Sequence, residues 1–283
     1  MTIIKLKDGL GNQLFQYAFG RVVSIKRNEE LLLDTSMLVV RGDVQRQYNL
    51  DNFNTKSSIA TFSQVEKFKY PLGVISKLCY MFRFKILRIF NIGWNSKILD
   101  SKKKYFEGYW QSYRYADMIR EELLEELQLK ENIENKYREV LEKINSINSV
   151  SLHVRRGDYV NNPKTRKIHN ICDLEYYRKA IEIVVDKIDN PIFFIFSDDI
   201  EWVKENLKSD HPLIFVSKPG IKDYEELIIM SKCKHNIIAN SSFSWWGAWL
   251  NVNREKIIIA PSKWNNRYQK EYKYLIPDNW IGI

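Results

Sequence analysis

Two adjacent arginines, Arg155 and Arg156, are the side chains in this sequence best suited to hold a diphosphate. Arginine stays charged at any physiological pH, and its planar fork of N–H donors forms charge-assisted, often bidentate hydrogen bonds with phosphate oxygens. Gly157 follows them and would let the backbone turn tightly. A solvated or salt-bridged pair is the alternative, but the position directly after a predicted strand favours the diphosphate-binding interpretation.

Carboxylates and hydroxyls follow two further predicted strands. Asp198 and Asp199 come after one of them, and the other is followed by Asn240, Ser241, Ser242 and Ser244. An aspartate can accept hydrogen bonds from both N1–H and the 2-amino group of guanine, which separates guanine from adenine. Asp198 with Glu201 also fits an N-capping pattern, so one aspartate could cap a helix while the other reads the base. The serines could bind phosphate at a helix start or simply cap that helix.

Asp158 is the preferred candidate for a base that takes the proton of an attacking hydroxyl, because it is a carboxylate close behind the arginines. It could equally orient Arg156 through a salt bridge, and both roles stay open. Asp173 and Glu175 are weaker candidates, since each is explained more simply as a residue at a helix N-terminus. His153 lies within the preceding strand, where a lone histidine is usually a satisfied core residue.

These side chains need a scaffold that brings strand ends together. From residue 150 onward, apolar strand-like runs alternate with helical patterns. The strands are predicted at 150–154, 192–196, 213–216, 236–239 and 256–259, and the helices at 173–187, 199–207, 222–232 and 243–251. Such alternation predicts a parallel sheet covered on both faces, with ligands at the carboxyl ends of its strands. The polar loops are therefore expected to form one nucleoside-diphosphate site.

The N-terminal part of the chain predicts a second β-α-β unit, with a strand at 3–6, a helix at 13–25 and a strand at 31–33. Gly11, Asn12 and Gln13 lie at or next to the glycine-containing loop after its first strand. The loop does not complete the dinucleotide fingerprint, because Leu14 stands where the third glycine belongs. A nicotinamide or flavin enzyme is thereby disfavoured.

A polar stretch at 145–149 precedes the second series of strands. We place the domain boundary there, which gives an N-terminal domain of residues 1–147 and a C-terminal domain of residues 148–283.

Composition and charge narrow the class of protein. A length of 283 residues, 45% of them hydrophobic and 28% charged, fits one large or two medium globular domains. The net charge of +9 favours anionic partners such as nucleotides, nucleic acid or an acidic membrane surface. None of the recognised nucleic-acid-binding motifs occurs, so a nucleic-acid-binding protein is kept only as one alternative. A non-catalytic protein that binds a nucleotide-sugar or a glycan is the other. An Asp-x-Asp triplet and metal-ligand histidine spacing are also absent, so no metal or other cofactor is expected.

The cysteines and hydropathy predict a cytoplasmic protein. Cys79, Cys172 and Cys233 are widely spaced and odd in number, which fits a reducing compartment rather than a disulfide framework. No uncharged apolar stretch approaches the roughly 18 residues that a membrane span needs.

One basic stretch could bring the protein to the inner face of a membrane. Between Glu66 and Asp100 the sequence has seven basic residues and no acidic one. A helix is predicted at 74–90, and residues 70–90 could contact an anionic membrane through its basic face. The alternative is a packed helix with a solvated basic edge.

Four segments together resemble glycosyltransferase family 11, the α-1,2-fucosyltransferases, in a bacterial form without a membrane anchor. They are residues 9–18 (GLGNQLFQYA), 153–159 (HVRRGDY), 196–199 (FSDD) and 240–249 (NSSFSWWGAW). The segments occur in the order of the family and span nearly the whole chain. Each alone is weak evidence, but the four in register are specific.

The resemblance implies an α/β, GT-B-like fold of two Rossmann-type domains with mainly parallel sheets and the nucleotide site in the C-terminal half. It implies metal-independent, inverting transfer of L-fucose from GDP-fucose to the 2-hydroxyl of a β-galactoside in a surface glycan or its precursor. Fucose transfer with another linkage is the alternative. The sequence specifies neither the exact acceptor nor the oligomeric state.

The resemblance also assigns roles by position. Arg155 and Arg156 would hold the diphosphate, and His153 would lie beside the nucleotide. Asp198 or Asp199 would read guanine. The remaining donor contacts would come from the loop containing Gly11, Asn12 and Gln13 and from the segment containing Asn240, Ser241, Ser242 and Ser244.

Overall fold

The computed structural model describes residues 1–38, 47–83, 91–157, 167–168 and 171–283, and the chain folds into two compact units. The first comprises Met1–Lys130 with Glu271–Leu275, and the second comprises Glu131–Lys270 with Ile276–Ile283. The first unit thus ends ahead of the boundary expected after residue 147. The reason is α6 (Arg138–Ser146), which buries Leu141 and Ile144 and packs next to α11 (Asp223–Lys232) of the second unit.

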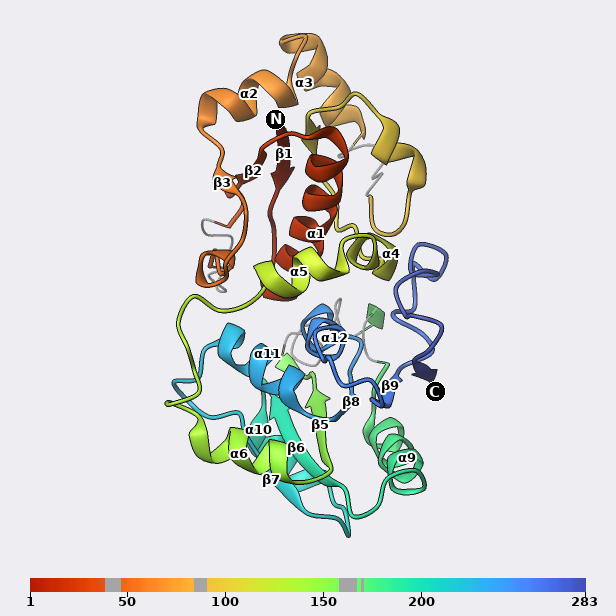
Figure 1. Cartoon of the computed structure of the whole chain (residues 1–283). Helices are drawn as coiled ribbons and strands as arrows, with labels where there is room; N and C mark the ends of the chain where they lie inside the picture. Colours follow the sequence, from red (N-terminus) through yellow and green to blue (C-terminus); the bar gives the residue numbers. More distant parts are fainter. Residues whose placement is uncertain (39–46, 84–90, 158–166, 169–170) are drawn as a thin grey trace. The chain divides into compact units, whose positions relative to one another are not determined.

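Among the described residues, four parallel strands form the sheet of the first unit, in the order β3-β2-β1-β4 (Figure 1). They are β1 (Thr2–Lys5), β2 (Leu31–Asp34), β3 (Ser58–Ile59) and β4 (Tyr105–Phe106). Helix α1 (Leu10–Arg27) connects β1 to β2, as the sequence predicted, and begins three residues earlier than expected. A Cβ atom on Gly20 would lie 2.5 Å from Ile4 Cγ1, so α1 packs very closely on β1 at this point.

Short helices complete the first unit. They are the 3-10 helices η1 (Leu50–Asn52) and η3 (Ser96–Asp100), and the α-helices α2 (Phe62–Lys69), α3 (Val74–Met81), α4 (Tyr113–Asp117) and α5 (Arg120–Glu126). Thr61 and Gln64 start α2 with a reciprocal capping box. Helix α3 occupies the first part of the predicted helix at 74–90, and residues 84–90 lie outside the described part. No residue of α3 is buried, which contradicts the packed-helix alternative over 74–81.

The second unit has six parallel strands among its described residues, in the order β10-β9-β8-β5-β6-β7. The strands are β5 (Ser149–Val154), β6 (Ile192–Ser197), β7 (Leu213–Phe215), β8 (His235–Ile237), β9 (Ile258–Ala260) and β10 (Ile281–Gly282). Besides α6 and α11, the helices are α9 (Leu174–Val185), α10 (Ile200–Asn206) and α12 (Ser242–Trp249). The predicted strands and helices are confirmed to within one or two residues at most ends.

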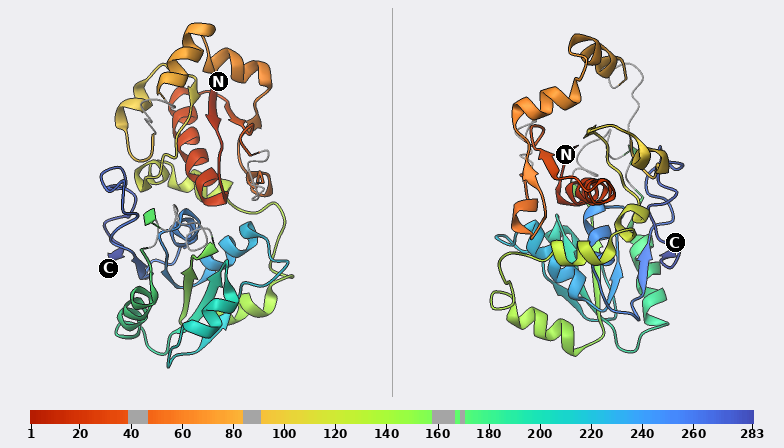
Figure 2. Two further views of the ribbon diagram at one scale, coloured as in Figure 1. Left: turned by 180° about the vertical axis from the view of Figure 1, so that it is seen from behind. Right: turned by 45° about the horizontal axis from the view of Figure 1, so that its top comes forward.

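The two faces of β5 carry different side chains. Val150, Leu152 and Val154 belong to a buried apolar core with residues of α9 and α10. The alternate residues face the other way: Ser151 Oγ accepts a hydrogen bond from Asn236 Nδ2, and the His153 ring lies 5.6 Å from that of Phe243 on α12. Figures 1 and 2 show helices on both sides of this sheet. Both faces are therefore covered, which explains why its strands are almost continuously apolar.

The strand order reverses at β5, which lies between β8 and β6. In sequence order from β5 onward, this is the arrangement of a dinucleotide-binding Rossmann sheet. Ligands of such sheets bind in the crevice outside the carboxyl ends of the strands at this switch point. The loops after β5 and β8 flank that crevice.

Candidate functional site

Two arginine–aspartate pairs join the loops after β5 and β6. Val154 pairs with Ser197 at the ends of the two strands, so the residues that follow emerge side by side. Arg155 Nη1 lies 3.0 Å from Asp198 Oδ2. Arg156 Nε lies 3.0 Å from Asp199 Oδ2. The structure thus brings together the four charged residues that the sequence singled out after these strands, and it shows the arginines as salt-bridged.

Asp198 is fixed by both of its carboxylate oxygens. The backbone N–H of Arg156 donates to Asp198 Oδ1 at 2.9 Å, while Oδ2 receives Arg155. A Cβ atom on Gly157 would lie only 2.4 Å from Asp198 Oδ2. The φ of Gly157 lies outside the left-handed region, so a special turn conformation is not what requires glycine there. The requirement is the close approach of the Asp198 carboxylate.

Asp199 and Trp202 hold Arg156 from two directions. The guanidinium carbon lies 3.4 Å from the centre of the Trp202 ring, and this stack fixes the plane of the guanidinium. The expected capping role is wrong for these aspartates. Asp199 stands at the N-cap position of α10 but makes no capping hydrogen bond with its side chain. Its backbone N–H instead donates to Ser197 Oγ at 3.0 Å.

A cavity of about 340 Å³ lies beside the arginines. Arg155, Arg156 and Trp202 line it together with residues at the start of α9. Its volume is within the range of small-ligand sites. Asp173 belongs to this rim but caps α9, because its carboxylate accepts the backbone N–H of Tyr176 at 2.9 Å. The simpler interpretation of Asp173 as a helix N-terminal residue is therefore confirmed.

His153 is buried, and among the described residues its Nδ1 has no hydrogen-bond partner. It is therefore not the satisfied core histidine that its position suggested. Burial, and secondarily the positive charge of Arg155, lowers the pKa of His153 to about 3. The imidazole is neutral at physiological pH. A neutral, unsatisfied imidazole can form a hydrogen bond with a ligand without adding charge.

The segment after β8 begins α12. Ser241 is the N-cap residue by position, yet its side chain makes no capping hydrogen bond, so simple capping does not explain it. Ser244 Oγ bonds backward to the carbonyl oxygen of Ser241 at 3.3 Å, and Asn240 Nδ2 donates to the Trp264 carbonyl at 3.0 Å. Ser242 is the first residue of the helix. Ser241 and Ser242 are thus the two hydroxyls at the helix start, while Ser244 and Asn240 also fix the backbone.

Glu226 and Ser217 are components of this region that sequence reasoning missed. The Ser197 backbone N–H donates to Ser217 Oγ at 2.9 Å, and the Ser217 hydroxyl in turn hydrogen-bonds the Glu226 carboxylate. Burial, reinforced by the negative charges of Asp223 and Asp198, raises the pKa of Glu226 to about 7. Its sequence signal is only a second glutamate near a helix start, which gives no indication of burial.

Three predicted residues lie on the first turn of α1 in the first unit. Gln13 is buried; its Nε2 donates to the carbonyls of Asp8 and Gln47 at 2.9 and 2.8 Å. Asn12 Oδ1 accepts Gln111 Nε2 at 2.6 Å. Gly11 is buried within the helix. Gln13 and Asn12 therefore hold loops of their own unit, and their expected contact with a donor stays a prediction.

Three further expectations concern the base, a metal site and a membrane-spanning helix. Asp158, the expected base or clamp for Arg156, lies outside the described residues. No group of three or more potential metal ligands occurs within residues 1–38, 47–83, 91–157, 167–168 and 171–283. Within the same ranges, no helix is both long and apolar enough to cross a bilayer.

Comparison with other sequences identifies the family. A family profile described as Glycosyl transferase family 11 matches residues 82–283. The O-antigen biosynthesis glycosyltransferase WbnK of Escherichia coli is 33% identical over 309 residues, which cover 98% of this chain and 99% of WbnK. An α-1,2-colitosyltransferase of Escherichia coli is 35% identical over 297 residues, 100% of this chain and 99% of the relative. Galactoside α-(1,2)-fucosyltransferase 2 of Gorilla gorilla gorilla is 28% identical over 190 residues, 63% of this chain and 54% of the relative.

Solved structures confirm the predicted fold class. Fucosyltransferase NodZ from Bradyrhizobium has a TM-score of 0.53 at 14% identity, covering 87% of this chain and 91% of NodZ. POFUT1 has a TM-score of 0.51 at 12% identity, covering 91% and 98%. These likenesses concern the GT-B fold, with its two parallel-strand α/β units. The matched profile and the two full-length relatives show that the chain is a glycosyltransferase and belongs to glycosyltransferase family 11.

Proposed function

We propose that this protein transfers L-fucose from GDP-fucose to the 2-hydroxyl of a β-galactoside in a surface glycan or its precursor. The observation that carries the proposal is the pair of arginines held by aspartates at the carboxyl ends of β5 and β6, next to the switch point. The α-1,2 linkage is supported by the names of the relatives that transfer colitose or fucose in that linkage.

In the proposed reaction, the acceptor oxygen attacks the anomeric carbon of fucose from the face opposite to GDP. The bond from that carbon to the β-phosphate oxygen breaks, the configuration inverts, and the acceptor proton passes to a base. Negative charge collects on the departing diphosphate, so fixed positive charge beside it lowers the barrier. Arg155 is proposed to supply most of this charge, with Arg156 beside it and no metal ion required.

The base is proposed to be Asp158, with orientation of Arg156 as its competing role. Because Arg156 already pairs with Asp199, a second carboxylate is not needed to hold it. A pH–rate profile of Asp158→Asn separates the roles. Loss of the acidic limb supports the base, and a change confined to donor affinity supports the positioning role.

Of the two aspartates, Asp199 is the one proposed to read guanine. Both oxygens of Asp198 are engaged by the arginine residues, whereas the Asp199 side chain is 42% exposed and only Oδ2 contacts Arg156. His153, Ser241 and Ser242 are proposed to contact the phosphates from the other side of the switch point.

The donor sugar is the finer point of the proposal. Colitose is fucose without its 3-hydroxyl, and one relative of full length is named for colitose transfer. We favour fucose because further relatives are named as galactoside α-1,2-fucosyltransferases. Parallel assays with GDP-fucose and the corresponding nucleotide-linked colitose decide between them.

The proposed setting is the cytoplasm, at the inner face of the membrane. Cys79, Cys172 and Cys233 are all free thiols, as expected in a reducing compartment. Peripheral contact with an anionic membrane through residues 70–90 is part of the proposal, because the described residues of α3 are unburied.

The decisive experiment is a screen of galactoside acceptors with GDP-fucose, with the product linkage determined by NMR and a chelator in a parallel arm. Arg155→Ala and Arg155→Lys are both expected to lose activity, since lysine keeps the charge but not the fork. Arg178→Ala, an exposed arginine of α9, is the matched control and should behave as wild type. Near-normal activity of Arg155→Ala, or activity lost to the chelator, would refute the proposed mechanism.

A further inference from the structure

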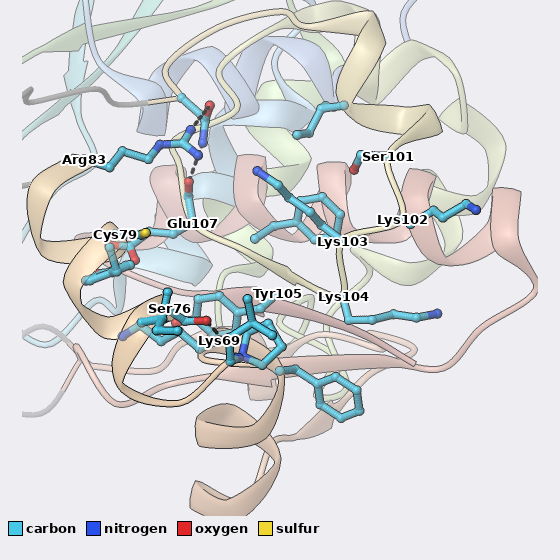
Figure 3. Close-up of a pocket in the computed structure, with 18 of the residues that line it drawn as sticks. Lys69, Ser76, Cys79, Arg83, Ser101, Lys102, Lys103, Lys104, Tyr105 and Glu107 are labelled. Atoms are coloured by element: carbon cyan, nitrogen blue, oxygen red, sulfur yellow. Dashed lines mark hydrogen bonds between the residues drawn. The ribbon is translucent and has the colours of Figure 1, made fainter.

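A cavity of about 780 Å³ in the first unit combines an apolar wall with basic side chains (Figure 3). Apolar residues of α2, α3 and β4 line it, among them Phe68, Ile75 and Phe106. The basic side chains around it are Lys69, Arg83, Lys102, Lys103 and Lys104. The donor chemistry of the second unit makes no use of this cavity.

Two of the five cations converge within the cavity. Figure 3 shows Arg83 and Lys103 pointing toward each other from opposite sides, while Lys102 and Lys104 point away. Burial and the charge of Arg83 lower the pKa of Lys103, so the two cations oppose each other. An anion placed between them would relieve this repulsion.

The nearby carboxylates are already engaged. Glu107, the acidic residue in the lining, accepts Lys5 Nζ at 3.2 Å and the Tyr80 hydroxyl at 2.6 Å. Lys104 pairs with Glu29. In the part of the chain that the structure describes, no carboxylate forms an ion pair with Lys103. Lys103 therefore brings to the cavity a positive charge that no described carboxylate pairs.

Lys69 adds a further positive charge to the cavity, and its ammonium is stabilised by aromatic rings. Its Nζ lies 4.5 Å from the centre of the Tyr80 ring and 5.1 Å from that of Tyr70. These cation–π contacts hold the ammonium at the cavity wall.

The apolar wall continues onto the surface. Leu72 and Ile75 line the cavity, yet they are 69% and 63% exposed. Val74 and Leu78 on α3 are exposed as well. Contiguous exposed apolar surface of this kind is typical of a protein or membrane contact. Because this apolar surface lies beside basic side chains, the partner that matches it is both apolar and anionic.

We propose that this cavity binds the headgroup of an anionic phospholipid in a bilayer, with the phosphate between Arg83 and Lys103 and the acyl chains against Leu72 and Ile75. A defined site distinguishes the two neighbouring lysines, because only Lys103 would contact the phosphate. A diffuse basic surface would attract the membrane through Lys102 and Lys103 alike. The defined site would hold α3 at the membrane surface, with its apolar residues among the lipid chains.

The first test is cosedimentation of the full-length protein with vesicles. Phosphatidylglycerol in phosphatidylcholine is the anionic probe, and phosphatidylcholine alone is the neutral one. Lys103→Gln is expected to weaken binding to the anionic vesicles about tenfold, and Lys102→Gln no more than about twofold. Equal losses of vesicle affinity in the two variants would refute the proposed site. A non-specific surface attraction contributes about 1 kcal/mol per lysine and would be weakened equally by either substitution.

The second test separates a lipid site from a simple phosphate site. Leu72→Ser should weaken vesicle binding several-fold, while Val252→Ser, equally exposed at 68% but in the second unit, should not. Inorganic phosphate at millimolar concentration should not displace the vesicles. An unaffected Leu72→Ser variant, or displacement by phosphate, would show an anion site only and overturn the lipid proposal.

A measurement on the unaltered protein guards against misfolded variants. Acetylation followed by mass spectrometry should show Lys103, but not Lys102, protected by short-chain phosphatidylglycerol. Equal protection of both lysines, or of neither, contradicts the site. Transfer to a soluble galactoside should be unchanged in Lys103→Gln, so failure of the lipid site and failure of the proposed transferase activity are distinguishable.

Discussion

Gly157→Ala is the substitution that most directly tests how the arginines are held. A Cβ atom at this position would lie 2.4 Å from Asp198 Oδ2, about 1 Å inside ordinary van der Waals contact. The carboxylate cannot turn aside freely, because the Arg156 N–H fixes Oδ1 at 2.9 Å and Arg155 fixes Oδ2 at 3.0 Å. Asp198 must therefore shift by about 1 Å, and it carries both arginines with it.

The expected loss of stability is small and the expected loss of activity is large. The two contacts are partly exposed, so weakening them costs about 1 kcal/mol, which the reduced entropy of the unfolded chain offsets in part. A displacement of about 1 Å in groups that position a substrate costs about 100-fold in rate. We expect kcat/KM for GDP-fucose to fall about 100-fold, with Tm lowered by no more than about 3 °C.

The assay is initial-rate kinetics with a soluble galactoside, paired with thermal unfolding. Gly282→Ala is the matched control, since its Cβ would lie at an ordinary 3.7 Å from Ser262. In an Asp198→Ala background the clash is absent, so Gly157→Ala should add nearly nothing there. Wild-type kcat/KM in Gly157→Ala, or additive losses in the double variant, would refute the reasoning.

Three further predictions concern residues near the two arginine–aspartate pairs. For Glu226, the folded-state pKa of about 7 lies above the ordinary value of 4.5, so its contribution to stability is full below about pH 4.5 and is lost as the pH rises through 7. Tm should therefore be higher at pH 5 than at pH 8, and this difference should be smaller in Glu226→Gln. His153→Phe should keep the wild-type Tm, since Nδ1 has no partner to lose among the described residues, while the donor KM from initial-rate kinetics rises about tenfold. Trp202→Ala should raise donor KM about fivefold through loss of the Arg156 stack, worth about 1 kcal/mol, and Trp202→Phe should retain part of it.

The strands of the second unit could be predicted because burial on both faces leaves a direct signal in the sequence. In β6 (Ile192–Ser197) five of six residues are buried, and the run is apolar up to Ser197. The polar residues that end such a run must lie at one edge of a parallel sheet. The alternation of strands and helices was therefore enough to place Arg155 and Asp198 at the same edge of the sheet.

The exact contacts could not be predicted, because they depend on strand order and side-chain packing. Whether β5 lies next to β6, β8 or both is decided by crossovers that the sequence pattern does not record. The need for glycine at 157 arises from Asp198, a residue far along the chain. Glu226 is similar, since its raised pKa comes from its burial near Ser217 and Asp198.

The unit to which α6 belongs could not be predicted from its sequence. Residues 138–146 alternate charged and apolar side chains, and the sequence pattern alone does not say which sheet the apolar side covers. Tyr137 and Lys136, just before the helix, bind Glu225 of α11 at 2.8 and 2.6 Å. These contacts attach α6 to the second unit, so the division falls after Lys130 rather than at the polar stretch at 145–149.

The arginine–aspartate pairs also explain how the proposed diphosphate site can be stable without its anionic ligand. Two guanidiniums alone at the strand ends would repel each other, and each is only 20–25% exposed. The aspartates remove that repulsion and set the guanidinium planes before a donor arrives. Each ion pair with an aspartate engages only part of the five N–H donors that an arginine carries. A lysine in the same place would direct its compact ammonium group at the aspartate and would have no planar pair of N–H donors to offer a phosphate. A preorganised fork costs little reorganisation as charge develops on the diphosphate, and that is where electrostatic stabilisation is most effective.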